Sequence, residues 1–467
     1  MKKCNKRAFS LALAMLTASC MITVGTGQNV RASAEAFSMT DILVPFWEGE
    51  TSYMESVLPV AQKDGTVAPI HLLYPIEEII EVKNASLNVT YQADVDYAVQ
   101  DGKLVLLEGT KIPVLSYDDF HPQAGSSNAV DGFEDRNGGY VLWKEGSWFH
   151  SRQIVVTYKH AAGYSGYIPE GKGRLLPTIQ EKLKDGELNV LVYGDSISTG
   201  ANSSGHEAIH VAPNMPIYPL LFAEGLKQTY GVETVNVYNA SVGGTDSAWG
   251  LSNLRGGVLN KYEDIDLAIL AFGMNDTARD PESFASNMQR MARGLTSKYK
   301  DVEVMIVATM LPNYEAYKFY GQQAHFYDAL MAYEKEGVAI VNMTATHAGL
   351  LDYKAYADMT GNNINHANDY LARVYAQTLL KTLEISDYGA EEPEPPENSE
   401  TPEAPETSDS LSSENSGNEE VPETNVSSSE EGSSKKSGGC GSVMGIGACG
   451  MTVLGAAALV AEQRKRK

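Results

Sequence analysis

The pattern of apolar and polar positions divides the central part of the chain into two kinds of structure. Between about residues 40 and 165 the apolar positions fall in short runs separated by turn signals, and long helical periods are absent. Strands are expected at residues 87–91, 97–100, 103–106 and 153–158. Asp101 and Gly102 stand between two of these runs and predict a hairpin with a two-residue turn. We therefore expect a β-rich, sandwich- or jelly-roll-like domain over residues 35–170.

From about residue 175 the pattern changes to alternating strands and helices. Apolar strands are predicted at residues 188–193, 235–239, 267–272, 302–308 and 338–343, and helices at residues 175–184, 216–230, 281–299, 323–336 and 369–383. This alternation is typical of parallel strands covered by helices on both faces, with functional residues on the loops at the carboxyl ends of the strands. It predicts an α/β domain over residues 171–388.

Both ends of the chain carry patterns of export and attachment. Residues 1–34 contain early bases, an apolar run and a closing Ala-Ser-Ala, as in a signal peptide. Residues 389–439 are rich in Pro, Ser and Glu, which predicts a disordered acidic stalk. Residues 440–467 hold a long uncharged run and end in bases, like bacterial surface-anchoring tails. We expect an exported protein held by its C-terminus on the membrane or wall of a bacterial cell, with cleavage of the tail left open.

Charge and cysteine content narrow the possible functions. The net charge is −24, and residues 35–390 carry most of it. A nucleic-acid-binding surface needs a basic footprint, which this composition does not provide. All four cysteines lie in the terminal segments, at positions 4, 20, 440 and 449, so the central part has neither a disulfide framework nor a cysteine-ligated metal.

Candidate chemistry begins directly after the predicted strand 188–193. Residues 194–198 read Gly-Asp-Ser-Ile-Ser, which places Ser196 at a sharp strand-to-helix turn where its hydroxyl can be presented to a substrate. Alone, this turn would be unremarkable in any protein. Three further segments follow later strands or precede the last helix: residues 239–247, 273–276 and 363–366. In this order and on these loops, the four segments resemble the four blocks of the SGNH (GDSL-type) hydrolases, in particular bacterial carbohydrate O-acetyl esterases.

The resemblance implies a flavodoxin-like three-layer α/β/α hydrolase domain and a role for each matched residue. Ser196 corresponds to the nucleophile and His366 to the general base. The backbone N–H groups of Ser196 and Gly244 and the side-chain amide of Asn275 correspond to the oxyanion hole. A serine hydroxyl needs a neighbouring base, and a tetrahedral oxyanion needs fixed donors, so these residue types suit the chemistry. The implied reaction requires neither a metal nor an organic cofactor.

One position departs from the family pattern. The family has an aspartate three residues before the histidine, whereas this chain has Asn363. An amide oxygen can fix the tautomer of His366 but adds no charge. We expect a Ser–His dyad that is oriented by the Asn363 side chain or by a main-chain carbonyl. Some polysaccharide deacetylases of the superfamily that this chain resembles, those of carbohydrate esterase family two, also work without the aspartate. Asp369 is a less favoured substitute, because it is expected to cap the last helix.

Other polar and aromatic residues leave alternatives open. His206, Glu207 and His210 could suggest a metal cluster, but they lack a third convincing ligand and are better read as loop or substrate-rim residues. Aromatic and polar residues that could bind a sugar ring, or simply pack, are Asp246, Trp249, Asn313, Tyr314 and Tyr317. Asp276 is expected to hold its own loop through backbone hydrogen bonds.

The substrate is not fixed by the scaffold, which serves acetylated sugars, lipids and thioesters alike. Export, a preceding β-rich domain and polar loops favour hydrolysis of O-acetyl esters of a polysaccharide through an acyl-enzyme. The alternatives are a lipase or lysophospholipase on the same scaffold, and a degenerate surface protein that binds glycans. The β-rich domain could bind sugar or support the loops of the site.

Overall fold

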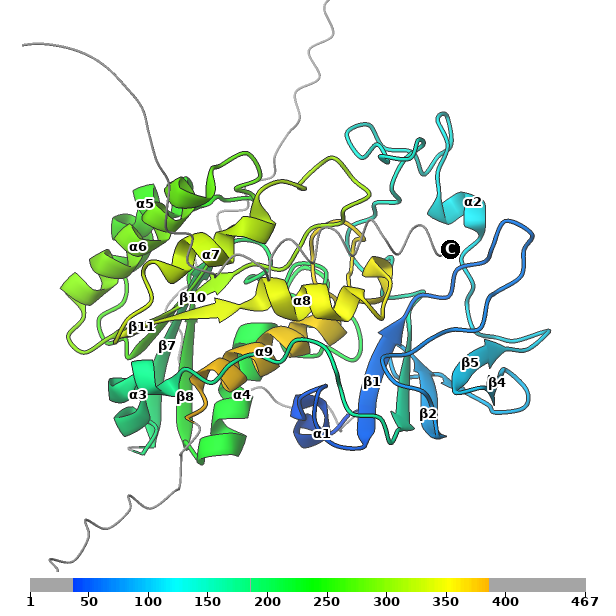
Figure 1. Ribbon diagram of the computed structural model, residues 1–467, viewed down its shortest axis with the longest axis horizontal. Coiled ribbons are helices and arrows are strands. Elements are labelled where there is room, and N and C mark those ends of the chain that lie inside the picture. The colour runs from blue at the N-terminus through cyan, green and yellow to red at the C-terminus, as the bar shows by residue number, and fades with distance from the viewer. Residues whose placement is uncertain (1–36, 185, 386–467) are drawn as a thin grey trace, which may run out of the picture. The chain divides into compact units, whose positions relative to one another are not determined.

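A computed structural model describes residues 37–184 and 186–385, and its larger sheet is parallel (Figure 1). The strands are β7 (Glu187–Gly194), β8 (Thr234–Asn239), β9 (Leu267–Ala271), β10 (Glu303–Ala308) and β11 (Val338–Asn342). Their order in the sheet is β11-β10-β9-β7-β8. The order reverses beside β7, so β7 and β9 flank the switch point where α/β sheets commonly bind ligands. This confirms the predicted flavodoxin-like α/β fold.

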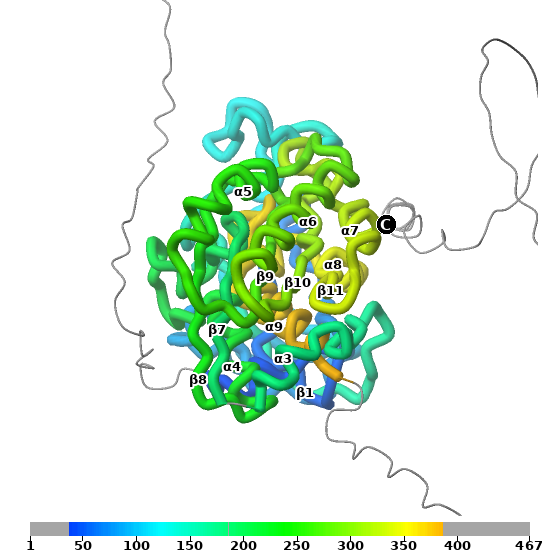
Figure 2. Tube along the Cα trace, turned by 90° about the vertical axis from the view of Figure 1, so that its left-hand side faces the viewer, coloured from blue at the N-terminus to red at the C-terminus, as the bar shows by residue number. Residues whose placement is uncertain are grey.

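Helices cover both faces of this sheet. They are α3 (Pro177–Lys182), α4 (Tyr218–Tyr230), α5 (Ser247–Leu254), α6 (Pro281–Lys298), α7 (Phe326–Met331), α8 (Met343–Leu351) and α9 (Asp369–Leu383). Val190 and Val192 of β7 belong to the core that includes α4 and α9, whereas Leu191 and Tyr193 belong to the core beneath α5, α6 and α7. The alternation follows from the two-residue period of a strand. Figure 2 shows the sheet between these two helical layers.

The N-terminal part is β-rich and antiparallel. Its elements are α1 (Met39–Leu43), β1 (Thr51–Val57), β2 (Glu78–Asn84), β3 (Thr90–Tyr91), β4 (Tyr97–Gln100), β5 (Lys103–Leu106), α2 (Tyr117–Phe120) and β6 (Ile154–Lys159). A four-stranded sheet runs in the order β1-β6-β2-β3, and β4 pairs with β5 in the predicted hairpin. Both turn residues of the hairpin, Asp101 and Gly102, have positive φ, as a two-residue turn of this kind requires. Residues 121–153 contain no regular strand or helix.

Several element boundaries differ from those expected. The strand predicted at residues 87–91 is reduced to Thr90–Tyr91, because Leu87 has a φ of 59° and belongs to a turn. The helix predicted at residues 323–336 is a 3₁₀ turn at Gln323–His325 followed by the six residues of α7. The helices α5 and α8 were not expected. Short irregular helices also occur at Gly173–Leu175, Arg255–Leu259 and Tyr356–Asp358.

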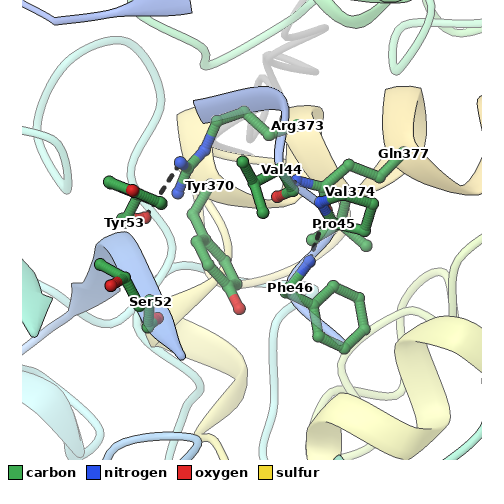
Figure 3. A pocket seen from close by; sticks show the side chains of 10 residues that line it. Val44, Pro45, Phe46, Ser52, Tyr53, Tyr370, Arg373, Val374 and Gln377 are labelled. Carbon is green, nitrogen blue, oxygen red and sulfur yellow. Dashed lines mark hydrogen bonds between the residues drawn. The ribbon is translucent and has the colours of Figure 1, made fainter. Parts of the chain in front are cut away.

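The two parts share a polar junction as well as a hydrophobic core. Arg373 of α9 donates hydrogen bonds to the carbonyl oxygens of Tyr53 and Met54 in β1, at 3.0 and 2.9 Å (Figure 3). Lys354 Nζ lies 2.6 Å from Glu55 Oε1, and both side chains are fully buried. Tyr158 of β6 donates to the other oxygen of Glu55. The described residues accordingly form one compact unit.

A small pocket opens at this junction (Figure 3). It is lined by residues of the N-terminal segment and of α9, and its lining includes neither Ser196 nor His366. In Figure 3 the guanidinium of Arg373 points from the helix toward Tyr53, and Phe46 lies beside Gln377. The pocket is therefore part of the packing between the two parts rather than of the candidate chemistry.

The predicted signal peptide (1–34), stalk (389–439) and anchor (440–467) lie outside the described residues. Within residues 37–184 and 186–385, no helix is long and apolar enough to cross a membrane.

We predict that Lys354→Met destabilises the protein by about 3–5 kcal/mol, because it leaves the carboxylate of Glu55 buried without its counter-ion. The measurement is the free energy of unfolding from denaturant titration. Lys159→Met is the matched control, since Lys159 pairs with Glu78 on the surface at 2.7 Å, where water screens the pair, and its loss should change the free energy of unfolding much less. Equal effects of the two substitutions would contradict a stabilising role of the buried pair.

Candidate active site

The end of β7 positions Ser196 on a tightly constrained turn. A side chain at Gly194 would place its Cβ 2.4 Å from the carbonyl oxygen of Ala271, so only glycine allows β7 to approach β9 this closely. Asp195 accepts the N–H of Ile197 at 3.0 Å, and the carbonyl oxygen of Ser196 accepts the hydroxyl of Thr199 at 2.8 Å. These bonds fix the turn and hold Ser196, which is 8% exposed, at the carboxyl end of the strand.

His366 lies against this serine. Its Nε2 is 2.9 Å from Ser196 Oγ, which is hydrogen-bonding distance. The loop before α9 presents the ring because the side-chain oxygen of Asn362 accepts the N–H groups of Ile364, Asn365 and His366. The carbonyl oxygen of His366 in turn accepts the N–H of Gly361. A hydroxyl and an imidazole in this arrangement can act as nucleophile and base.

The loops after β8 and β9 meet beside the serine. A Cβ at Gly243 would lie 3.7 Å from Ser196 Cβ, so this glycine is directly next to the nucleophile candidate. Gly244 has a φ of +74°, a conformation that glycine adopts without strain. The side-chain nitrogen of Asn275 donates to the carbonyl oxygen of Thr245 at 3.0 Å. Asn275 is thereby tied to the loop that carries Gly244, and this loop lies beside Ser196.

Donors are available for a developing negative charge at this place. In the described part of the chain, neither the N–H of Ser196 nor that of Gly244 donates to another protein group. The Asn275 amide has a second hydrogen beyond the one given to Thr245. Each of the three groups therefore has a hydrogen available for an oxyanion, as the expected oxyanion hole requires.

A protein-family comparison agrees with this geometry. The model of the GDSL-like lipase/acylhydrolase family matches residues 192–374, a range that contains Ser196, Gly244, Asn275 and His366. Residues 192–374 are therefore similar to this family. No curated protein matches the chain.

Solved structures of esterases are similar to parts of the chain. A two-domain esterase active on acetylated mannans, co-crystallised with mannopentaose, has 19% identity and a TM-score of 0.35 and covers 45% of this chain. An acetyl xylan esterase, AlAXEase, has 18% identity, a TM-score of 0.33 and 41% coverage of this chain. Axe2, an acetylxylan esterase from Geobacillus stearothermophilus, has 13% identity, a TM-score of 0.35 and 47% coverage. The alignments cover 98% of each xylan esterase, but only 53% of the mannan-active esterase.

Unlike the expected arrangement, Asn363 of the GDSL-like domain does not contact the imidazole. Its side-chain nitrogen donates to the carbonyl oxygen of Leu142 at 3.1 Å, and its side-chain oxygen accepts from Asn313 at 3.3 Å. The residue is buried and has a φ of +63°, which directs its side chain into the neighbouring loops. The structure therefore corrects the prediction that Asn363 orients His366.

The substitutes considered for Asn363 are also engaged elsewhere. Asp369 does not serve as the cap of α9, because Asn368 fills that position by accepting the N–H of Leu371. One oxygen of Asp369 accepts the N–H of Ser204 at 2.7 Å, and the other lies 4.0 Å from His150. No main-chain carbonyl of the described residues accepts a hydrogen bond from His366 Nδ1.

The partner of Nδ1 is Asn202. Its side-chain oxygen lies 2.5 Å from His366 Nδ1, and its side-chain nitrogen donates to the carbonyl oxygen of Gly146 at 3.2 Å. The second contact orients the amide so that its oxygen faces the ring. Accepting the Nδ1 hydrogen leaves a lone pair on Nε2 for the proton of Ser196.

Glu145 is a second group on this side of the ring. Its Oε2 lies 3.7 Å from His366 Nδ1, while its Oε1 accepts from Trp143 at 2.9 Å and from Asn362 at 3.0 Å. Burial raises the pKa of Glu145, but hydrogen bonding and charge from His366, with the hydrogen bonds of Asn362 and Trp143, outweigh it and bring the pKa to about 2. Asn362 Nδ2 lies 3.1 Å from Nδ1, but its two hydrogens are used by Glu145 and Asn365.

The sequence alone did not predict a role for Asn202 or for Glu145. Asn202 lies six residues after Ser196, in a Gly-Ala-Asn-Ser-Ser-Gly loop whose polarity gave the only available signal. Glu145 precedes the histidine by more than 200 residues and lies in the stretch assigned to the β-rich domain. No spacing rule within the GDSL-like blocks points to it.

Asp195 and Asp276 support the turn and the oxyanion loops. Burial raises the pKa of Asp195 to about 7, against the lowering effects of the Ile197 hydrogen bond and the charge of His366. Asp276 accepts both the N–H and the hydroxyl of Ser247, at 2.9 and 2.6 Å. Its backbone bonds to Gly273 and Arg279 hold its own loop, as predicted, and its side chain in addition holds the start of α5. Arg279 bridges Asp276 and Asp246.

The histidine-rich loop shows no metal-binding arrangement. In the described ranges there is no group of three or more His, Cys, Asp or Glu residues that could hold a metal ion. Glu207 and His210 are exposed. His206 accepts the N–H of Ala208 through Nδ1 and is close enough to His366 to feel its charge. His206 thus lies at the rim of the site.

We predict that Asn202→Ala lowers kcat by about 10- to 100-fold, because Nδ1 loses the acceptor that fixes the tautomer. Asn363→Gly is the comparison, since glycine tolerates the positive φ of this position. This variant should have a lower melting temperature, but its kcat should fall less than that of Asn202→Ala. Steady-state kinetics on p-nitrophenyl acetate and thermal unfolding measure both effects. A larger loss of kcat in Asn363→Gly than in Asn202→Ala would contradict this assignment.

Proposed function

We propose that the protein is a serine esterase that removes O-acetyl groups from a polysaccharide. The observation that carries the proposal is the 2.9 Å contact between Ser196 Oγ and His366 Nε2, beside three available oxyanion donors. In this mechanism His366 takes the proton of Ser196 as Oγ attacks the ester carbonyl, and then returns it to the sugar hydroxyl that leaves. Water activated by the same imidazole hydrolyses the acetyl-enzyme and releases acetate.

The surroundings of the imidazole favour a small acyl group on a polar alcohol. The side chains beside His366 are the polar groups Asn202, Asn362 and Glu145 rather than an apolar groove for a long acyl chain. Asn202 and Asn362 are buried and bonded within the protein, whereas the side chain of Glu145 is 46% exposed and can bond to a sugar hydroxyl. An alkyl chain packed against this carboxylate would remove the charge from water without compensation.

An aromatic surface close to the site supports a carbohydrate substrate. Asn313 is buried and bonded to Asn363, but Tyr314 and Tyr317, which follow it, are 42% and 57% exposed. The guanidinium of Arg136, from the N-terminal part, lies 4.9 Å and 4.6 Å from the centres of these two rings. An exposed, immobilised tyrosine ring offers an apolar face with a polar rim, which suits a sugar ring.

Export and attachment are part of the proposal and rest on the sequence. The signal-peptide pattern of residues 1–34 and the uncharged run with its basic end in residues 440–467 support an enzyme attached to the cell surface. An acetylated polysaccharide is a substrate that is present outside a cell.

We expect the full-length protein to release acetate from at least one of acetylated xylan, mannan, pectin or peptidoglycan, and Ser196→Ala to abolish the release. A fluorophosphonate probe should label the wild-type protein but not Ser196→Ala. Preferential cleavage of long-chain acyl esters would instead identify a lipase or lysophospholipase. Absence of probe labelling together with retained glycan binding would identify a degenerate binding protein.

We predict that kcat/KM for p-nitrophenyl acetate falls as the pH is lowered, because the base must be neutral to accept a proton. Asp195, with a pKa raised to about 7 by burial, also gains a proton within the measured range, so the fall should be broader than a single titration. Initial rates between pH 4 and 9 test this. A profile that is flat down to pH 4 would rule out a histidine base.

A further inference from the structure

The imidazole of His366 faces a carboxylate that the N-terminal part of the chain supplies. Glu145 Oε2 lies 3.7 Å from His366 Nδ1, on the side of the ring opposite Ser196. Among the described residues, His366 is the only ion-pair partner of Glu145. The position three residues before the histidine holds an uncharged asparagine that points elsewhere, so Glu145 is the nearest source of negative charge behind the ring.

The carboxylate is held in place rather than merely adjacent. Trp143 Nε1 and Asn362 Nδ2 both donate to Oε1, at 2.9 and 3.0 Å. Because two donors hold Oε1, the other carboxylate oxygen, Oε2, faces the imidazole. The indole of Trp143 is itself stacked on Phe133 at 4.4 Å, which anchors the loop that carries Glu145.

We propose that Glu145 is a positioning residue that supplies the negative charge needed when His366 becomes protonated. This inference rests on the proposed function, because it assigns a role in the same Ser196–His366 reaction. Asn202 accepts the Nδ1 hydrogen and sets the tautomer; Glu145 stabilises the imidazolium. The two tasks that one aspartate performs in the family pattern are thus divided between an amide from the loop after β7 and a carboxylate from the N-terminal part.

The proton balance shows when this charge matters. In each half of the reaction, a hydroxyl or water proton moves to Nε2 as a bond forms from oxygen to the acyl carbon, and the ring becomes a cation. The proton then passes to the leaving oxygen as its bond to carbon breaks. Nδ1 keeps its hydrogen throughout. A negative charge near Nδ1 favours the cationic state and lowers both barriers, whereas it is not needed to bind the ester.

Other titratable groups also act on the ring. Asp195 precedes the nucleophile and interacts with His366 through charge, and His206 does so from the rim. Asp195 is buried on the serine side of the site, whereas Glu145 approaches Nδ1. The low pKa of Glu145, about 2, keeps it ionised between pH 4 and 9, where the rates are to be measured. Substituting Glu145 therefore removes one charge over the whole working range of pH.

The decisive variant is Glu145→Gln in the full-length protein, with p-nitrophenyl acetate as substrate. Glutamine keeps an oxygen to accept from Trp143 and Asn362 but carries no charge. We expect kcat to fall by about 10- to 100-fold with KM changed less than about twofold, because the lost interaction belongs to the transition state. The acid limb of the kcat/KM profile should move to lower pH, since the ring gains its proton less readily without the nearby carboxylate.

Two variants serve as comparisons. Glu134→Gln removes an exposed carboxylate from the same N-terminal stretch, where Glu134 accepts the N–H of Gly132 and does not contact the imidazole. It should change kcat less than twofold and leave the acid limb in place. Glu145→Asp retains the charge on a shorter side chain, so its kcat should lie between those of the wild type and Glu145→Gln.

A relocated charge separates an electrostatic role from a structural one. Asn202→Asp replaces the amide whose oxygen lies 2.5 Å from Nδ1 by a carboxylate and gives up the hydrogen bond to the Gly146 carbonyl. The double variant Asn202→Asp/Glu145→Gln should therefore have a kcat at least tenfold above that of Glu145→Gln and should restore the acid limb. A structural role, holding Trp143 and Asn362, would not be rescued in this way. Wild-type kinetics in Glu145→Gln, a change in KM alone, or no rescue by the double variant would overturn the inference.

The failure of this inference is distinguishable from failure of the proposed function. Labelling of wild-type Ser196 by a fluorophosphonate and turnover of p-nitrophenyl acetate establish the esterase independently of Glu145. If the wild type shows both and Glu145→Gln matches it in kcat and pH profile, only the role of Glu145 is refuted. If the wild type shows neither, the proposed function fails and the inference fails with it.

Discussion

The candidate chemistry depends on how both nitrogens of one imidazole are occupied. His366 can accept the proton of Ser196 only if Nε2 carries a lone pair, which requires that the hydrogen stay on Nδ1. Asn202 Oδ1, at 2.5 Å from Nδ1, meets that requirement, and the bond from Asn202 to Gly146 keeps the amide from turning over. The loop after β7 therefore provides both the nucleophile and the group that prepares its base. A disturbance of this loop would affect both functions at once.

The N-terminal part is not a detachable module, because it contributes residues to the candidate site. It supplies Gly146, which orients Asn202, and Glu145, which faces the imidazole. Its attachment to the α/β part rests on buried charges: Arg373 of α9 bonds two carbonyls of β1, and Lys354, which follows α8, pairs with Glu55. Buried charges are stabilising only with their partners in place, so the junction is intolerant of separation. Two roles were considered for the β-rich part, sugar binding and support of the active-site loops. The contacts described here favour support of the loops.

The fold and the reacting pair were predictable because their signals are local. Strand and helix periods placed β7, β9 and α9 nearly to the residue, and the blocks around Ser196, Gly244, Asn275 and His366 each follow or precede such an element. The helices α5 and α8 were missed: Gly250 interrupts the first, and the second is apolar around much of its circumference, with Met343, Thr346 and Leu350 buried. Neither shows the amphipathic period by which a helix is recognised.

The orientation of His366 could not be predicted because it depends on residues remote in the chain. Asn363 has the spacing of an orienting residue, but its positive φ turns its side chain to Leu142 O and Asn313. Those contacts join the stretch that leads to Glu145 to the one that leads to Tyr314 and Tyr317. An aspartate there would place an acceptor-only carboxylate against the carbonyl of Leu142 and lose that bond. Asparagine at this position is therefore suited to joining the two loops. It is not needed to orient the imidazole, because Asn202 and Glu145 lie next to Nδ1.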